Sequence, residues 1–140
     1  MILSFADITS EPVEKKVKEQ DATEASNIYL LKGDDYYASQ ILRRFNLTPE
    51  TAQDPISQSV KNVVMLYVCV LVATDNVGLE LTALNDYNYA DAWKARLKAF
   101  QDQLKMAEDS LLLSDVALVD PETDVPLEST FGRKAINRYG

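Results

Sequence analysis

The chain has 140 residues, of which 46% are hydrophobic and 26% are charged, and its formal net charge is −8 at pH 7. This composition indicates one soluble globular domain with its own core and excludes a disordered chain. The negative charge disfavours adhesion to nucleic-acid backbones and to anionic membranes, although it is compatible with a protein that DNA passes without binding.

The residue types that are absent narrow the chemistry. These 140 residues include no histidine and a single cysteine, Cys69, so they offer no intramolecular disulfide, no Ser-His or Cys-His catalysis and no His-ligated metal. Cys69 lies in an apolar run, where we expect a small buried hydrophobe. The first residues lack the basic region and long apolar core of a signal peptide, which favours synthesis in the cytoplasm.

The first 31 residues predict two short helices. Thr9 or Ser10 is a suitable cap for a helix with Pro12 in its first turn. Val13 and Val17 lie four apart among charged residues, so that helix buries one narrow face. Residues 21–31 then place apolar side chains at helical spacing: Ala22, Ala25, Ile28 and Leu30 or Leu31.

A further helix is predicted between residues 34 and 45. Gly33 interrupts the preceding pattern, and Asp34 is a suitable cap for a new segment. Arg43 and Arg44 stand near its C-terminal end, where cations suit the helix dipole. Residues 46–53 read as a loop. The apolar residues of this segment recur at helical spacing: Tyr37, Ile41, Leu42 and Phe45.

The most apolar stretch of the chain, residues 60–73, predicts the central helix. It is shorter than the roughly 20 apolar residues that a membrane-spanning helix needs. Its β-branched residues would suit a strand, but Asp54-Pro55 is a helix-start signal and Asn76-Val77-Gly78 is a helix-stop signal. We therefore expect a helix over about 55–75, buried on all sides because it is apolar nearly all round.

The clearest periodicity follows at residues 88–112, which we expect to form a long amphipathic helix. One continuous apolar stripe alternates spacings of four and three: Trp93, Leu97, Phe100, Leu104, Ala107 and Leu111. The charged residues fall off this stripe: Lys94, Lys98, Asp102, Lys105 and Asp109. Packing against the 55–75 helix is the plainer interpretation, and a coiled-coil seam is the alternative.

The last part of the chain changes character. Residues 116–119 and 125–127 flank a turn-forming stretch, which predicts two short extended pieces resembling a β-hairpin, with Pro126 restricting the second piece to an edge. We therefore divide the chain into a mainly α, helical-bundle domain, 1–128, and an extended basic C-terminal arm, 129–140. The domain has 11 basic and 22 acidic residues, a net of −11, whereas the arm has three basic residues and no acidic one.

The arm is the candidate partner-binding site. It combines apolar anchors with bases that suit an acidic surface, and another copy of this acidic chain is one such surface. The alternative is a disordered terminus. The residues that we expect to make contact are Phe131, Arg133, Lys134, Ile136, Arg138 and Tyr139.

The sequence gives little indication of a catalytic site. Asp34-Asp35 and Asp86 with Asp91 are the only acidic clusters to offer as a metal or acid–base site, and helix capping and solvation explain them better. No glycine-rich phosphate loop or nucleophile elbow is present in these 140 residues. We expect no enzyme activity, no cofactor and no metal.

The order of elements resembles the helical head–tail connector (adaptor, or head-completion) proteins of tailed bacteriophages. Three passages within residues 20–140 carry the resemblance. They are residues 33–45 before a proline-containing loop, the helix 56–73, and the helix 89–100 with the later Phe131-Gly-Arg133.

This resemblance implies a ring-forming structural protein of the virion neck. Its partners would be further copies of itself, typically twelve in a ring, the portal protein, and a tail or neck protein, with no membrane. DNA would pass through the channel without specific binding, and the arm would reach the portal or a neighbouring copy. Two alternatives stay open: a cytoplasmic helical module that captures an acidic partner with its tail, and a metal enzyme using Asp34, Asp35, Asp86 or Asp91.

Overall fold

The computed structural model describes residues 1–83 and 87–118, with the side chains of residues 1–77 and 92–118. These residues form helices, and none of them forms a strand. The mainly α prediction is therefore confirmed. The second extended piece of the expected hairpin, residues 125–127, and the arm, 129–140, lie outside the described residues.

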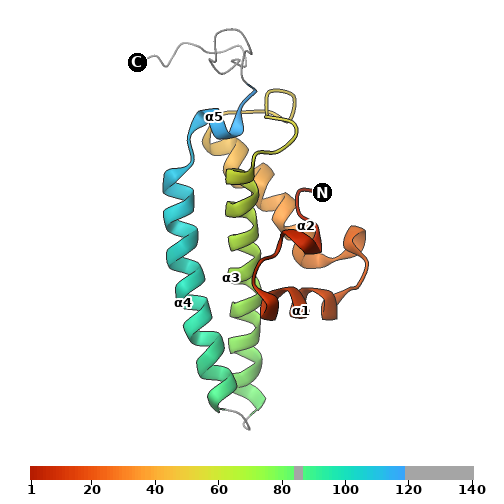
Figure 1. Ribbon diagram of the computed structural model, residues 1–140, viewed down its shortest axis with the longest axis vertical. Helices are drawn as coiled ribbons and strands as arrows, with labels where there is room; N and C mark the ends of the chain where they lie inside the picture. Colours follow the sequence, from red (N-terminus) through yellow and green to blue (C-terminus); the bar gives the residue numbers. More distant parts are fainter. Residues whose placement is uncertain (84–86, 119–140) are drawn as a thin grey trace.

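Two long antiparallel helices form the spine of the molecule (Figure 1). They are α3, Gln58–Ala83, and α4, Tyr87–Ser110, and they make the most extensive helix–helix contact in the described chain. The predicted packing of a central helix on an amphipathic one is confirmed. Of the predicted stripe, Trp93 on α4 and Leu111, directly after its last residue, are buried, and the four residues between them are partly buried against the core.

Both predicted boundaries of α3 were wrong. The helix begins at Gln58, because the Ser57 hydroxyl accepts a hydrogen bond from the Val60 N–H at 3.3 Å and replaces the expected Asp54 cap. It runs on past the expected stop, because the Asn76 amide is buried and donates to the Val72 carbonyl at 2.8 Å. An asparagine satisfied inside a helix has no need of the left-handed conformation that would end it.

The greater length of α3 also changes the comparison with membrane spans. Its segment Gln58–Val77 is long and apolar enough to cross a membrane, by length and composition alone. Of an 18-residue apolar window within this segment, 56% is buried inside the protein, a pattern that core helices of soluble proteins also show. The apolar run is thus part of a longer helix than its own 14 residues indicated.

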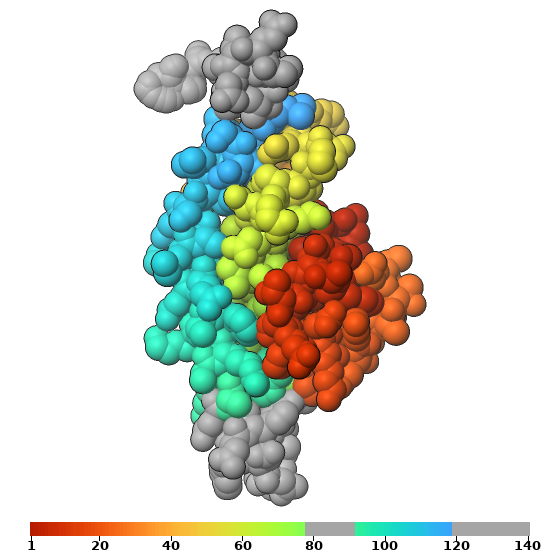
Figure 2. Space-filling model, viewed as in Figure 1, coloured from red at the N-terminus to blue at the C-terminus, as the bar shows by residue number. Residues whose placement is uncertain are grey.

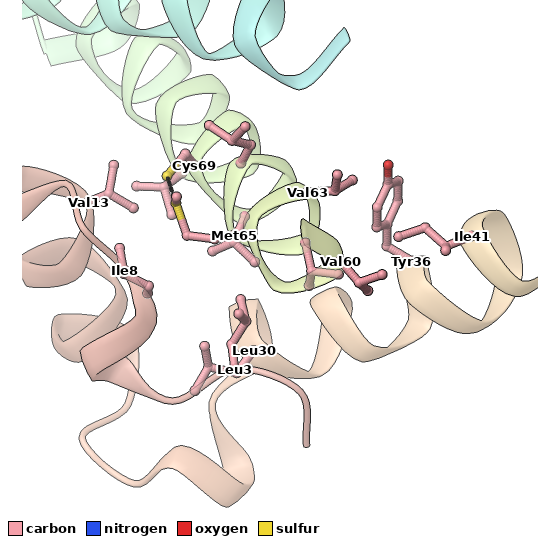
Figure 3. Close-up of a cluster of buried hydrophobic side chains, with 14 of the residues drawn as sticks. Leu3, Ile8, Val13, Leu30, Tyr36, Ile41, Val60, Val63, Met65 and Cys69 are labelled. Carbon is pink, nitrogen blue, oxygen red and sulfur yellow. Dashed lines mark hydrogen bonds between the residues drawn. The ribbon is translucent and has the colours of Figure 1, made fainter. Parts of the chain in front are cut away.

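The core surrounds α3, as predicted for a helix apolar on nearly all sides. Figure 3 shows Leu3 and Ile8 from the N-terminal segment and Leu30 and Tyr36 from α2 directed at α3. Cys69 is 1% exposed, and burial raises the pKa of its thiol to about 12, so it is a small core hydrophobe. The α3 residues with 1% exposure or less are Val60, Val63, Val64, Val68, Cys69, Val72 and Ala73.

The first predicted helix is confirmed as α1, Glu11–Gln20, and it packs on α3 on the side away from α4 (Figure 1). Ser10 is its N-cap residue, and Val13 and Val17 are fully buried. Upstream lies the short 3-10 helix η1, Phe5–Asp7, where the Asp7 carboxylate accepts from the Ser4 N–H at 2.8 Å.

The predicted helix over residues 21–31 was wrong. The chain makes a short 3-10 helix, η2 (Glu24–Ser26), and then α2 (Ile28–Tyr36). Asn27 separates them, because its side-chain oxygen accepts from the N–H groups of Tyr29 and Leu30 and so starts a new helix. The apolar residues expected on one buried face are therefore divided: Leu30 is buried, whereas Ala22, Ala25, Ile28 and Leu31 are exposed.

Asn27 also fixes α1 to α2. Its side chain is fully buried, and its amide N–H groups donate to the carbonyls of Val17 at 2.8 Å and Asp21 at 2.7 Å. One side chain thus ends one helix and begins the next.

The predicted break at Gly33 was also wrong, since α2 continues through it. A Cβ atom at this position would lie 3.0 Å from Cγ1 of Val64 and 3.4 Å from Cγ2 of Val68, so the glycine lets α2 approach α3 closely. Asp34 caps no helix. Its carboxylate accepts from the Ile2 N–H at 2.8 Å and secures the N-terminal segment.

Beyond α2 the helix continues as a π-helical turn, η3, Tyr37–Leu42. The apolar spacing predicted there is confirmed, since Ile41 and Leu42 are buried and Tyr37 and Phe45 are partly buried against the core.

The end of the described chain differs from the extended piece expected at 116–119. Val116 ends a short helix, α5 (Leu113–Val116), and Ala117 forms an isolated antiparallel bridge with Ala52. The Gln53 N–H donates to the Val116 carbonyl at 2.7 Å. The extended stretch therefore pairs with the loop before α3, far away in sequence, which a local hairpin pattern does not reveal.

Candidate interaction surface

The expected contact residues of the arm all lie outside the described residues: Phe131, Arg133, Lys134, Ile136, Arg138 and Tyr139. The described residues instead present a groove that the sequence did not indicate. One part of it lies between α2–η3 and α3, and the adjoining part lies between α2–η3 and the C-terminal end of α4. We call it the α2–α4 groove and define it by Asp35, Tyr36, Arg44, Tyr67, Leu71 and Glu108.

The groove consists of two adjoining hollows with volumes of about 420 and 560 Å³, which share Tyr36 and Gln40. Its floor is apolar and aromatic. The ring of Tyr36 stacks on that of Tyr67, with centroids 4.1 Å apart and planes 12° apart, and Tyr67 and Leu71 are partly exposed beside it.

The Tyr36 hydroxyl connects the two walls by donating a hydrogen bond to the Glu108 carboxylate. Burial raises the pKa of Tyr36 above its ordinary value, and the hydrogen bond to Glu108 raises it further. The tyrosine therefore keeps its proton and remains a donor throughout the neutral range.

Arg44 makes the second connection between the walls. Its guanidinium donates to the Glu108 carbonyl at 2.7 Å, within the last turn of α4, and lies 4.9 Å from the Phe45 ring centroid. The sequence indicated that Arg44 would face the end of its own helix. The tertiary structure places its charge at the C-terminal end of a different helix, where the dipole interaction is equally favourable.

At the other end of the groove, α2 is fastened to α3 by Tyr29, whose hydroxyl donates to the Asp75 carboxylate at 2.6 Å. Ile28 and Leu31 project from the outer side of α2 and are 49% and 41% exposed. Asp35 is also exposed, and within the described chain its carboxylate has no ion-pair or hydrogen-bond partner. The solvent-exposed residues of α2 are thus apolar at Ile28 and Leu31 and charged at Lys32 and Asp35, which line the groove.

The acidic residues considered for a metal are not brought together in the described residues. Asp34 is engaged by the Ile2 N–H, and no group of three potential ligands occurs among the side chains that the structure describes, 1–77 and 92–118. Asp86 and the side chain of Asp91 lie outside the described structure. Tyr36 and Tyr67 could not be recognised as groove residues from the sequence, because tyrosine in a helical segment is typical of core packing. Their place in one groove follows only from the packing of α2 against α3.

The fold and the groove together define an all-helical protein, built on an α3–α4 hairpin with an open surface between α2 and α4. No known family model, curated protein or solved structure matches the chain.

Proposed function

We propose that this chain is a non-enzymatic structural protein of a tailed-bacteriophage virion, an adaptor in the neck between portal and tail. Copies of it would form a ring through which DNA passes. The proposal is supported by the helical order at 33–45, 56–73 and 89–100, which resembles head–tail connector proteins and which α2–η3, α3 and α4 follow.

One observation carries the proposal furthest: the molecule has two dissimilar faces on opposite sides of α3. In Figure 2 the N-terminal segments cover one side, and α4 covers the other. Residues 1–36 contain eight acidic and four basic residues, a net of −4, whereas α4, residues 87–110, contains four of each. Sides that differ in charge favour a head-to-tail contact between copies, the kind of contact that generates rings.

The acidic body supports the proposed passage of DNA. With 22 acidic against 11 basic residues in 1–128, a channel made of these domains would repel phosphates. DNA would then slide through without the multiple cation–phosphate contacts that produce adhesion.

The size of the assembly tests this function. We expect mass photometry of the full chain, alone or mixed with the portal protein of its phage, to show a large closed ring, and electron microscopy to show a central channel. A chain that stays monomeric in both samples would contradict the adaptor. A monomer or dimer that binds an acidic protein through residues 129–140 would establish the alternative, a cytoplasmic binding module.

A further inference from the structure

The α2–α4 groove has the chemistry of a peptide-binding surface. Its floor offers the faces of Tyr67 and Leu71, both partly exposed, above the buried Tyr36. Its rims carry two exposed carboxylates, Asp35 on α2 and Asp109 on α4. With Glu108, three carboxylates and two cations (Lys32 and Arg44) line the groove, a net charge of −1. Asp109 has an ion pair with Lys105 of its own helix at 3.8 Å, but both side chains are more than two-thirds exposed, so this pair is weak.

We propose that this groove binds the basic arm, residues 129–140, of a neighbouring copy of the chain. The arm is complementary to the groove in its apolar side chains and in its charge. Phe131, Ile136 and Tyr139 supply apolar anchors for the floor, while its three basic residues and lack of acidic ones suit the carboxylates on the rims. The inference rests on the proposed ring, because it assigns the contact between adjacent copies.

The dimensions of groove and arm agree. The α2–η3 wall runs from Lys32 to Arg44, about 18 Å at the helical rise of roughly 1.5 Å per residue. An extended segment from Phe131 to Ile136 spans about 17 Å at roughly 3.3 Å per residue. Phe131 and Ile136 are therefore far enough apart to occupy the two ends of the groove.

The exit point of the chain allows the arm to reach the groove of a neighbouring copy. The described chain ends at Leu118, which pairs with Thr51 at the α5 end of the molecule, and Leu111 at the near end of the groove is only seven residues earlier. Residues 119–128 span up to about 33 Å when extended, nearly twice the length of the groove. This length suffices to reach across to an adjacent subunit, and the head-to-tail contact of the proposed ring would place such a subunit beside each copy.

Site-directed crosslinking tests the contact in the full-length chain. One preparation carries Ser39→Cys in the groove, a second carries Asn137→Cys in the arm, and the two are mixed under mild oxidation. The matched control replaces Ser39→Cys with Asn62→Cys, which is also exposed and lies on α3 outside the groove. Buried Cys69 is the same in all preparations.

We expect the groove cysteine to form inter-chain disulfides at least about tenfold faster than the control, because a docked arm has an effective concentration near the millimolar range. Gln40→Cys, which also lines the groove, should behave like Ser39→Cys. Adding Asp35→Lys should slow the reaction several-fold, whereas Glu50→Lys, in the loop before α3, should not. Equal rates at groove and control positions would overturn the proposal.

Two further outcomes separate this inference from the ring. A closed ring in mass photometry without preferential groove crosslinking overturns the docking site and leaves the adaptor standing. Inter-chain groove crosslinks without a closed ring support the docking site and contradict the adaptor. A chain carrying both cysteines that forms only intra-chain disulfides overturns docking between copies.

Discussion

At Gly33 a single missing side chain decides how closely α2 packs on α3. We expect Gly33→Ala to reduce the free energy of unfolding by about 1 kcal/mol, because overpacking costs about 1–3 kcal/mol and alanine recovers at most about 1 kcal/mol of helix propensity. The new Cβ would meet Val64, which is fully buried and β-branched and so has little freedom to move.

Urea denaturation of a double-mutant cycle with Val64→Ala measures this effect. Since the smaller residue makes room, Gly33→Ala should be neutral or stabilising in the Val64→Ala background. The same loss in both backgrounds would contradict the close-approach explanation.

Tyr36 and Tyr67 allow the contribution of one hydrogen bond to the free energy of unfolding to be measured. Their rings stack on each other, but only the Tyr36 hydroxyl has a hydrogen-bond partner among the described residues. Tyr36→Phe should cost about 1 kcal/mol through loss of the bond to Glu108. Tyr67→Phe should cost much less, since its hydroxyl has no hydrogen-bond partner among the described residues. Chemical denaturation of both variants makes the comparison, and equal losses would argue against a bond between α2 and α4.

The raised pKa of Tyr36 predicts a dependence of stability on alkaline pH. Below about pH 10 the tyrosine is protonated in both states and contributes no pH dependence. Above that pH it ionises in the unfolded chain and stays protonated in the folded one, so the free energy of unfolding falls as pH rises. The stability gap between wild type and Tyr36→Phe should therefore narrow from about pH 9 to about pH 11 in urea titrations, and a constant gap would contradict it.

At the scale of elements, Asn27 holds the N-terminal helices together. Asn27→Ala should cost about 2–4 kcal/mol, because it removes the N-cap of α2 and leaves the carbonyls of Val17 and Asp21 without their buried donor. Asn62→Ala, at an exposed position on α3, is the matched control and should change stability by less than about 0.5 kcal/mol. Thermal or urea unfolding distinguishes the two.

For the whole molecule, the division between helical body and arm predicts separable effects. Deleting residues 129–140 should leave the helix signal in circular dichroism unchanged, because the core cluster is built from residues up to Val116. The same deletion should weaken assembly, measured by the mass distribution of the particles, because it removes the proposed contact between copies. Lower helicity in the truncated chain would show that the arm belongs to the fold.

The sequence by itself determined the helical class, the central helix and its partner. Periodicity is a local property, so the stripe from Trp93 to Leu111 and the pair Val13–Val17 identified buried faces correctly. The same local rules misjudged Gly33 and Asn76. Glycine and asparagine end helices when exposed, but these two residues lie in the interior, where close packing or a bond to a carbonyl of the same helix keeps them helical.

Only the tertiary structure decided where the groove lies. Tyr36, Tyr67 and Glu108 come from three helices, and no spacing in the chain relates them. Arg44 likewise meets the end of α4, 64 positions away. Contacts between elements depend on how the helices pack, and that is set by the sum of many side-chain volumes around α3, which no short pattern records.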